Sequence, residues 1–237
     1  MAIKAVLFDL DGTLLPMDQR AFFREYFKLL TAKLAPLGYD DPKAFVKAMW
    51  QGVDKVCNND GKRKNCEVFW EFFSSVYGEK VKEHIPVIDQ FYFEEFEKAK
   101  VVCGYNPEAN ATVKKFKEKG LKCVIATKPI FPYPAISKRM EWAGLDENDF
   151  EFLTTYEVCN YCKPQKKYFE EIASRLGLST EECLMVGNDV DDDMPAEKCG
   201  MKVFLLTDTL INNENKDISN YRQGSFDELI KYVDELI

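Results

Sequence analysis

Histidine is almost absent from this 237-residue chain, in which His84 is the only one. A Ser-His-Asp or Cys-His mechanism needs an imidazole as its general base, and one isolated histidine makes neither a serious candidate. A second Cys-x-x-Cys pair is also missing, so the pair at residues 159–162 lacks the further ligands that a zinc site requires. We expect the eight cysteines to be mainly small, buried side chains in a reducing compartment.

Long apolar runs and an excess of positive charge are missing as well. No run approaches the length of a membrane span, and residues 1–4 lack the pattern of a signal peptide, so we expect a cytoplasmic protein without a membrane partner. The formal net charge of -8 argues against nucleic acid as the main partner. With 46% hydrophobic residues the chain fits one large domain or a core with a small insert, and either a monomer or a dimer is compatible with it.

Strand and helix patterns alternate over most of the chain. Apolar runs typical of buried strands lie at residues 5–8, 121–126, 152–155, 182–186 and 202–206. From residue 107 onward the strands are separated by amphipathic helix patterns, several of which end at a glycine. This alternation predicts a doubly wound, three-layer parallel α/β domain.

The chain after the first strand, by contrast, carries helix patterns only. We expect four helices over residues 18–34, from Pro42 onward, around 68–76 and over about 79–99, with the last kinked or split near Pro86. Short connections favour an antiparallel four-helix bundle. The sequence therefore predicts a helical domain at residues 17–101, inserted into an α/β domain formed by residues 1–16 and 102–237.

The first strand runs directly into Asp9-Leu10-Asp11-Gly12-Thr13. Two carboxylates at the end of a buried strand are costly unless a metal ion or a reaction compensates them. Gly12 indicates a sharp turn where a ligand can approach the backbone. Asp-Gly is also an ordinary turn dipeptide, so the pattern gains weight only from polar residues elsewhere in the chain.

Such residues follow the other predicted strands. Thr127 and Lys128 come after the second strand, Asp189, Asp192 and Asp193 come after the fourth, and Lys163 opens a helix. Each of them alone has an ordinary explanation, such as a solvated lysine or an acidic helix start. Ligands of open parallel sheets bind beyond the carboxyl ends of the strands, so we expect these side chains to meet there.

These motifs, in this order, resemble those of the haloacid dehalogenase (HAD) superfamily. Asp-x-Asp-Gly-Thr, then Thr127, then Lys163-Pro164, then an acidic run from Gly187 to Asp193 correspond to its four motifs, and the resemblance covers essentially the whole chain. It implies strand order 3-2-1-4-5 and makes the helical insert a C1-type cap. Dehalogenases of the superfamily lack the second aspartate, so the resemblance, with Asp11 present, implies the phosphatase branch. Asn188 departs from the pattern, because many members have Gly-Asp directly.

The resemblance also implies roles for individual residues. Asp9 is the expected nucleophile, which forms an aspartyl-phosphate, and Asp11 is the expected general acid and base. The groups expected to bind phosphate are the side chains of Thr127, Lys128 and Lys163 and the backbone N–H groups near Leu10 and Gly12. Mg²⁺ is the expected cofactor, held by Asp9, the Asp11 carbonyl and Asp189, and supported by Asn188 and by Asp193 or, less favoured, Asp192.

A phosphatase acting on a small phosphorylated metabolite is the favoured function. The loop between the second and third helices is expected near the leaving group, where it would place Asn58, Asn59, Lys62 and Arg63 to select the substrate; an ordinary solvated loop is the alternative. A phosphomutase would use the same catalytic residues. A non-catalytic HAD-like binding or regulatory protein is disfavoured, because all the motif residues are intact.

Overall fold

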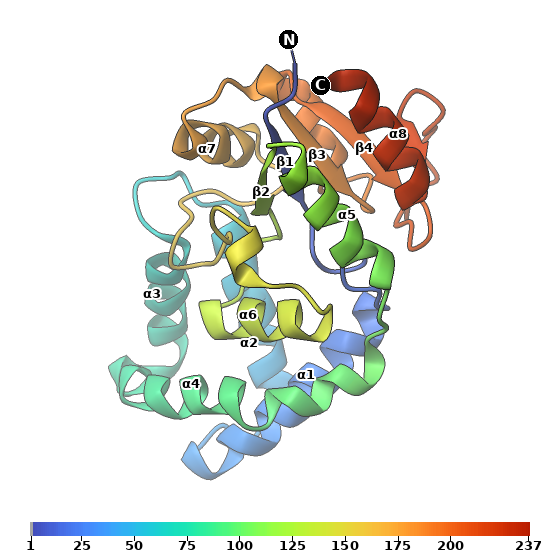
Figure 1. Ribbon diagram of the computed structural model, residues 1–237. Coiled ribbons are helices and arrows are strands. Elements are labelled where there is room, and N and C mark those ends of the chain that lie inside the picture. The colour runs from blue at the N-terminus through green and yellow to red at the C-terminus, as the bar shows by residue number, and fades with distance from the viewer. Residues whose placement is uncertain (1) are drawn as a thin grey trace.

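A parallel five-stranded sheet forms one end of the computed structural model, which describes residues 2–237 (Figure 1). Its strands, in the spatial order β2-β1-β3-β4-β5, are β1 (Ala5–Phe8), β2 (Lys122–Ile125), β3 (Cys183–Gly187), β4 (Lys202–Leu206) and β5 (Arg222–Gly224). The first four match four of the five predicted strands and lie in the order expected for them. The predicted parallel α/β class is confirmed.

Both edges of the sheet differ from the prediction. Residues 152–155 form only an isolated parallel bridge, between Leu153 and Ile125, instead of a strand. The chain turns away there because the N–H groups of Val158 and Cys159 both donate back to the Thr155 carbonyl at 3.1 Å. At the other edge β5 was not expected, since its Arg-Gln-Gly sequence is polar and lacks a strand pattern.

Helices cover both faces of the sheet. One face packs against α5 (Pro107–Glu118) and α8 (Phe226–Leu236), and the other against α7 (Lys166–Leu176) and the 3-10 helix Met194–Cys199, whereas α6 (Tyr133–Trp142) packs against the inserted helices. Within β1, Val6 and Phe8 belong to the first hydrophobic cluster, whereas Ala5 and Leu7 belong to the second. This alternation buries every side chain of β1, as the unbroken apolar run predicts.

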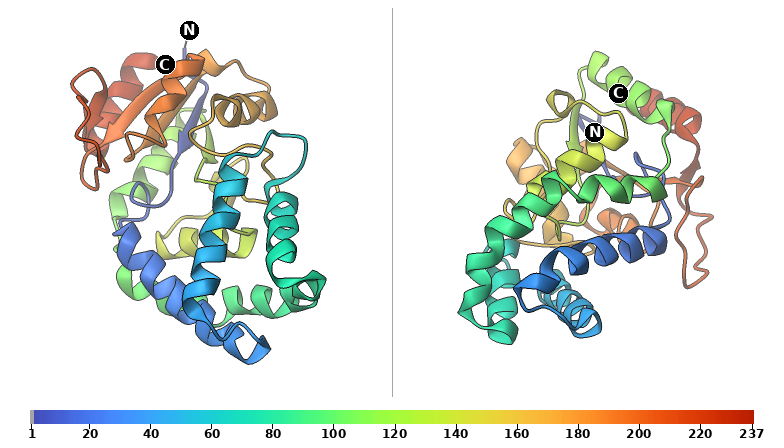
Figure 2. Two further views of the ribbon diagram at one scale, coloured as in Figure 1. Left: turned by 180° about the vertical axis from the view of Figure 1, so that it is seen from behind. Right: turned by 90° about the horizontal axis from the view of Figure 1, so that it is seen from below.

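The chain between β1 and β2 is helical, as expected. It forms α1 (Gln19–Leu34), α2 (Pro42–Cys57), α3 (Asn65–Tyr77) and α4 (Ile85–Phe93), with 3-10 helices at Ala35–Leu37, Glu79–His84 and Phe96–Val102. The helix predicted over residues 79–99 is thus divided into three pieces, and Pro86 lies in the first turn of α4, where it costs no hydrogen bond. Because α4 is short and lies across the end of α3, the helices depart from a simple antiparallel bundle (Figures 1 and 2). Further single 3-10 turns are Glu147–Asp149 and Thr180–Glu182.

An aromatic cluster joins these helices to the sheet end of the molecule. Tyr26 of α1 lies with its ring centroid 6.0 Å from that of Phe96 and 5.3 Å from that of Phe131. The Tyr26 and Tyr92 hydroxyls hydrogen-bond to each other at 2.8 Å, which satisfies both buried polar groups. Phe96 stacks on Trp142 of α6 at 5.0 Å, so one continuous core runs from the inserted helices to the sheet. Within residues 2–237, no helix combines the length and apolar character needed to cross a bilayer.

This cluster predicts a large difference between two neighbouring phenylalanines. Phe96 is fully buried, whereas Phe93 is 71% exposed. Phe96→Ala leaves a cavity where the helices meet α6, and we expect it to lower the free energy of unfolding by about 3–5 kcal/mol. Phe93→Ala is the matched control, with an expected change within about 0.5 kcal/mol. Urea unfolding followed by circular dichroism measures both, and equal losses would contradict this description of the core.

Candidate active site

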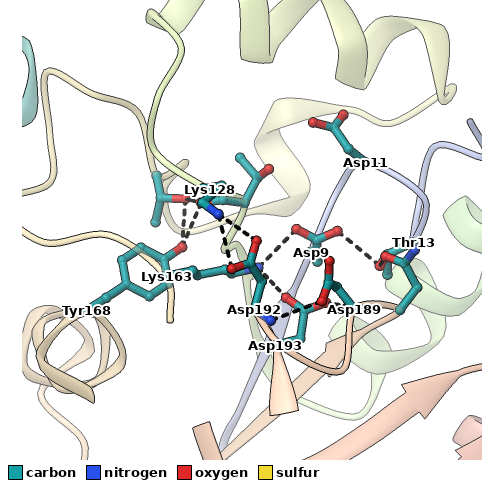
Figure 3. A network of polar contacts seen from close by, with 12 residues as sticks. Asp9, Asp11, Thr13, Lys128, Lys163, Tyr168, Asp189, Asp192 and Asp193 are labelled. Carbon is teal, nitrogen blue, oxygen red and sulfur yellow. Dashed lines mark hydrogen bonds and ion pairs between the residues drawn. The ribbon is translucent and has the colours of Figure 1, made fainter. Parts of the chain in front are cut away.

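Asp9 occupies the first position after β1, where the chain leaves the sheet. Its Oδ1 accepts a hydrogen bond from Lys163 Nζ at 3.0 Å, and its Oδ2 lies 3.1 Å from Thr13 Oγ1 (Figure 3). The turn between Asp9 and Thr13 depends on Gly12, which has φ +90° and whose missing side chain would collide with the Asn188 amide. The Asp9 carboxylate is therefore held by Lys163 at one oxygen and by Thr13 at the other.

Lys163 is the buried cation of the site. Besides Asp9, its Nζ donates to Asp193 Oδ1 at 2.6 Å. Burial by itself would lower the pKa of Lys163, but the carboxylates of Asp193 and Asp9 outweigh burial and raise the pKa above its ordinary value. Lys163 thus carries a positive charge at neutral pH, inside the protein and next to Asp9.

The segment after β3 supplies further carboxylates. Asp193 Oδ2 accepts a hydrogen bond from the Asp189 backbone N–H at 3.0 Å, and burial raises the pKa of Asp193 in spite of Lys163. Asp189 accepts from the backbone N–H groups of Asp191 and Asp192, while burial and the Asp192 carboxylate raise its pKa. Asp192 points elsewhere, toward Lys128 Nζ at 2.8 Å. The structure thus places Asp193, rather than Asp192, directly behind Asp189.

Asp11 has a partner that the sequence analysis did not identify. Arg139 of α6 is completely buried and forms an ion pair with Asp11 Oδ2. Its guanidinium also lies 4.4 Å from the ring centroid of Phe131 and 5.6 Å from that of Phe22. Burial raises the pKa of Asp11 even though Arg139 opposes the shift. In Figure 3 Asp11 lies apart from the polar network around Asp9.

A signal for Arg139 was present in the sequence, but it was weak. The helix period places Arg139 one turn after Ala135, on the buried side of α6, where an arginine needs a partner. Adjacent Lys138 is an ordinary surface lysine, so the dipeptide alone gives no reason to separate the two.

Two of the predicted backbone and support positions are already engaged within the protein. The Gly12 N–H donates to the Leu15 carbonyl at 2.8 Å, so it is not available to phosphate in this conformation, contrary to the expectation. The Leu10 side chain is buried in the hydrophobic core. Asn188 lies behind the site, with its Oδ1 2.9 Å from Thr13 Oγ1 and its amide nitrogen donating to the Thr209 carbonyl.

A cavity of about 180 Å³ lies over these groups. Its polar side is formed by Asp9, Asp11, Thr127, Lys128, Lys163, Asp189, Asp192 and Asp193. Its other side is formed by Gln19 and by an apolar wall of Met17, Phe22, Phe23, Trp50, Val53, Ile130 and Phe131. The structure therefore brings together the polar side chains expected after β1, β2 and β3, and it adds an apolar wall that was not expected.

The loop expected to select the substrate lies outside this cavity. It does face the sheet end of the molecule, but it packs on residues 156–161, where Lys64 Nζ donates to the Val158 carbonyl at 2.7 Å. Its side chains bond locally: Asn58 to the Asp54 carbonyl, Asn59 to Asn65, Lys62 to Asp60 and Arg63 to Glu71. The expected placement of these four residues near the leaving group is therefore wrong, because local partners hold them elsewhere.

The fold and the site together define a Rossmann-like enzyme in which the aspartate directly after the first strand contacts a buried lysine. The chain belongs to the haloacid dehalogenase-like hydrolases, because the model of that family matches residues 3–200. The predicted superfamily is thus confirmed, and the chain is a hydrolase by family.

Individual relatives agree with this assignment. The chain is 25% identical over 206 residues to the putative phosphatase YhcW of Bacillus subtilis, which covers 86% of this chain and 83% of the relative. The structure of the present chain is similar to that of a HAD phosphatase from Thermococcus onnurineus, with a TM-score of 0.60, 22% identity and 98% of each chain covered. It is also similar to the putative HAD-hydrolase YfnB of Bacillus subtilis bound to magnesium, with a TM-score of 0.55, 19% identity, and 98% of this chain and 99% of that one covered. These two structures share the fold.

Loss of the buried Asp11–Arg139 pair should destabilise the protein more than loss of a surface pair. Arg139→Ala leaves the Asp11 carboxylate without its cation, and we expect it to lower the free energy of unfolding by about 3 kcal/mol. Lys138→Ala, which removes only the surface pairs with Glu97 and Glu141, should cost less than about 1 kcal/mol. Urea unfolding gives both values.

The double variant Asp11→Asn/Arg139→Ala identifies the origin of that loss. If the unpaired carboxylate causes it, the two substitutions are not additive and the double variant is more stable than their sum predicts. Additive losses, or equal losses from Arg139→Ala and Lys138→Ala, would contradict the pairing.

Proposed function

We propose that the protein is a phosphatase that hydrolyses a small phosphate monoester through an aspartyl-phosphate at Asp9. The observation that carries the proposal is the position of Asp9, at the end of β1, on a cavity that it shares with Lys163 and Thr127. Asp11 supports a phosphate ester as substrate, because a second carboxyl group, two residues after Asp9, can give a proton to the alkoxide that leaves. The relative named as a putative phosphatase agrees with this reaction.

In the proposed reaction an Asp9 carboxylate oxygen attacks phosphorus, and the bond from phosphorus to the ester oxygen breaks. Asp11 gives its proton to the departing alkoxide, and the raised pKa of Asp11 favours the protonated form that this step needs. Water then attacks the aspartyl-phosphate while Asp11 takes up its proton, which releases phosphate and restores Asp9. For these steps the Asp11 side chain, which already lines the cavity, turns from Arg139 toward Asp9.

Lys163 and Thr127 act on the phosphoryl group. The Lys163 ammonium lies beside Asp9 and so offers positive charge where the phosphoryl oxygens approach. The Thr127 side chain lines the same cavity, while its carbonyl is fixed by hydrogen bonds from the Thr154 and Tyr168 hydroxyls, both at 2.8 Å. Lys128, although paired with Asp192, also lines the cavity and is a further phosphate contact in this proposal.

The charges of the site fit a divalent cation. Among residues 2–237, the basic side chains that pair with the carboxylates of Asp9, Asp11, Asp189, Asp192 and Asp193 are Lys128, Arg139 and Lys163. Two carboxylates are therefore in excess, and Asp189 is the one that pairs with no basic side chain among residues 2–237. Desolvation without a counter-charge raises the pKa of Asp189, as expected for a site that a cation completes.

We therefore assign Mg²⁺ to Asp9, Asp189 and the Asp11 carbonyl, a set of oxygen ligands to which waters are added. When bound, the ion neutralises the repulsion between the phosphate dianion and the carboxylates. The described part of the chain contains no cluster of three or more His, Cys, Asp or Glu side chains arranged to hold a metal. The magnesium-bound relative of similar fold supports this choice of ion.

The helices of residues 17–101 form the cap domain in this proposal, and residues 1–16 and 102–237 form the core domain. The insertion lies between β1 and β2, and α1 and α2 contribute Phe22, Phe23, Trp50 and Val53 to the cavity. A cap of the C1 type, inserted at this point of the chain, accounts for both features. It closes the cavity on the side opposite Asp9 and limits the access of water.

Phosphate release from a panel of sugar, nucleotide, carboxylic acid and aryl phosphates tests the proposal. With Mg²⁺ present we expect turnover that falls at least roughly a thousandfold in Asp9→Asn, because the nucleophile is lost. Removal of Mg²⁺ with a chelator should have a comparable effect. Asp60→Asn, an exposed aspartate paired with Lys62, is the control and should retain activity.

The other outcomes separate the alternatives. Conversion of an ester to an isomeric phosphate without phosphate release would indicate a phosphomutase on the same site. A folded, Mg²⁺-supplemented protein that releases phosphate from no ester would contradict the phosphatase and favour a binding protein.

The role of Asp11 predicts a dependence on the leaving group. We expect Asp11→Asn to reduce hydrolysis of alkyl phosphates at least roughly a hundredfold, since an alkoxide needs a proton to depart. Hydrolysis of p-nitrophenyl phosphate, whose leaving group departs as a stable anion, should fall much less. Measuring kcat for both esters in both forms of the enzyme decides this, and equal losses would exclude Asp11 as the general acid.

A further inference from the structure

The cavity above Asp9 has two chemically different sides. Its charged side chains come from the segments after β1, β2 and β3 and from Lys163 before α7, and of these Asp11 lies apart from Asp9 and is paired with Arg139. On the helical side, where the alcohol portion of a phosphate ester would extend, Gln19 is the one polar side chain among the described lining residues. The rest of that side is the apolar wall.

A smaller inner cavity of about 50 Å³ lies among the helices, beside the apolar wall. Both cavities are lined by Phe23, Trp50, Val53, Ile130 and Phe131, so they adjoin at these side chains. At roughly 10–15 Å³ for each atom of the size of a water molecule, the inner cavity has room for about four such atoms. It therefore fits the end of a short chain or part of one ring, but no further large group.

The polar atoms around the inner cavity are paired with one another. The Tyr26 and Tyr92 hydroxyls are joined at 2.8 Å, and Trp70 Nε1 lies 3.4 Å from the Tyr156 hydroxyl. A sugar hydroxyl placed there would lose its hydrogen bonds to water and would meet only these tyrosine hydroxyls, each of which is already engaged in one hydrogen bond, and this exchange is costly. Binding of methylene or aromatic carbons in the same place is favourable, because their transfer from water to an apolar surface lowers the free energy.

We propose that the leaving group of the substrate is an apolar alcohol, a short alkyl chain or a single aromatic ring, that lies along the apolar wall and ends in the inner cavity. The proposal rests on the phosphatase function, since it places the phosphate at Asp9. Trp50 and Phe131 are the specificity-determining residues, with Trp50 contributed by α2 and Phe131 by the segment before α6. Sugar and nucleotide phosphates are disfavoured, because Asn58, Asn59, Lys62 and Arg63 lie elsewhere, and Gln19 is the one side chain among the described lining residues that can bind hydroxyls on this side.

A series of primary alkyl phosphates tests the proposal without changing the leaving-group chemistry. We expect kcat/KM to rise roughly threefold to fourfold for each methylene from ethyl to butyl phosphate, and to level off once the inner cavity is filled. Glycerol 1-phosphate, with the same carbon number as propyl phosphate but two more hydroxyls, should be at least about tenfold poorer than propyl phosphate.

Variants of Trp50 connect this preference to the apolar wall. Trp50 is 41% exposed, so Trp50→Ala should fold, and we expect it to reduce the gain per methylene to less than twofold. Trp50→Phe should restore most of the gain, since an aromatic surface remains. Asn58→Ala, in the loop outside the cavity, is the control and should leave the whole series unchanged.

The inference and the phosphatase function can fail separately. A flat alkyl series, or a preference for glycerol 1-phosphate, with hydrolysis still lost in Asp9→Asn, would overturn the apolar leaving group and leave the phosphatase intact. If no ester is hydrolysed, the phosphatase fails, and calorimetric titration of Asp9→Asn with ethyl and butyl phosphate still decides the inference. Tighter binding of butyl phosphate would support it, and equal or absent binding would overturn it.

Discussion

The site depends on one buried cation, the ammonium of Lys163 between Asp9 and Asp193. These three residues come from segments far apart in the chain: the end of β1, the approach to α7 and the turn after β3. A buried charge without its partner is strongly destabilising, so each member fixes the position of the others. The ion pairs thereby join the loops at the carboxyl edge of the sheet and hold Asp9 in place before any ligand arrives. Two further hydrogen bonds complete the arrangement: the Thr13 hydroxyl donates to Asp9, and the Asp189 backbone N–H donates to Asp193.

Two further ion pairs surround this centre, and both hold aspartates at the rim of the cavity. Lys128 holds Asp192, and Arg139 holds Asp11 away from the network of Asp9. Asp189 alone keeps no basic partner in the described chain, which concentrates the unbalanced negative charge beside Asp9. This excess negative charge attracts a divalent cation or a positively charged group. Burial and the nearby Asp192 carboxylate raise the pKa of Asp189, because no basic side chain stabilises its charged form. The ion pairs therefore set Asp189 apart from the four other carboxylates of the site, each of which has a basic partner.

Stability and substrate choice share a single set of aromatic side chains. Phe22 and Phe131 pack against Tyr26 and lie over the buried guanidinium of Arg139, and the same two rings line the cavity. The aromatic core that attaches the helices to the sheet thus also forms the surface on which the proposed apolar alcohol lies. This sharing explains why the cavity is apolar on the helical side: the rings are required there for packing, and few positions remain for polar groups.

The sequence by itself determined the parallel α/β class, four of the sheet strands and the polar side chains that meet at their carboxyl ends. Those features follow from local patterns, namely buried apolar runs and the motifs directly behind them. Only the tertiary structure decided the partner of Asp11, the apolar wall, the position of the loop around Asn58 and Arg63, and the edge strand β5. Each of these depends on which distant segment lies opposite. In the sequence, the buried Arg139 cannot be told from its partly exposed neighbour Lys138, and a polar loop cannot be told from a binding loop. Their partners are set by packing across the whole chain, which no local pattern encodes.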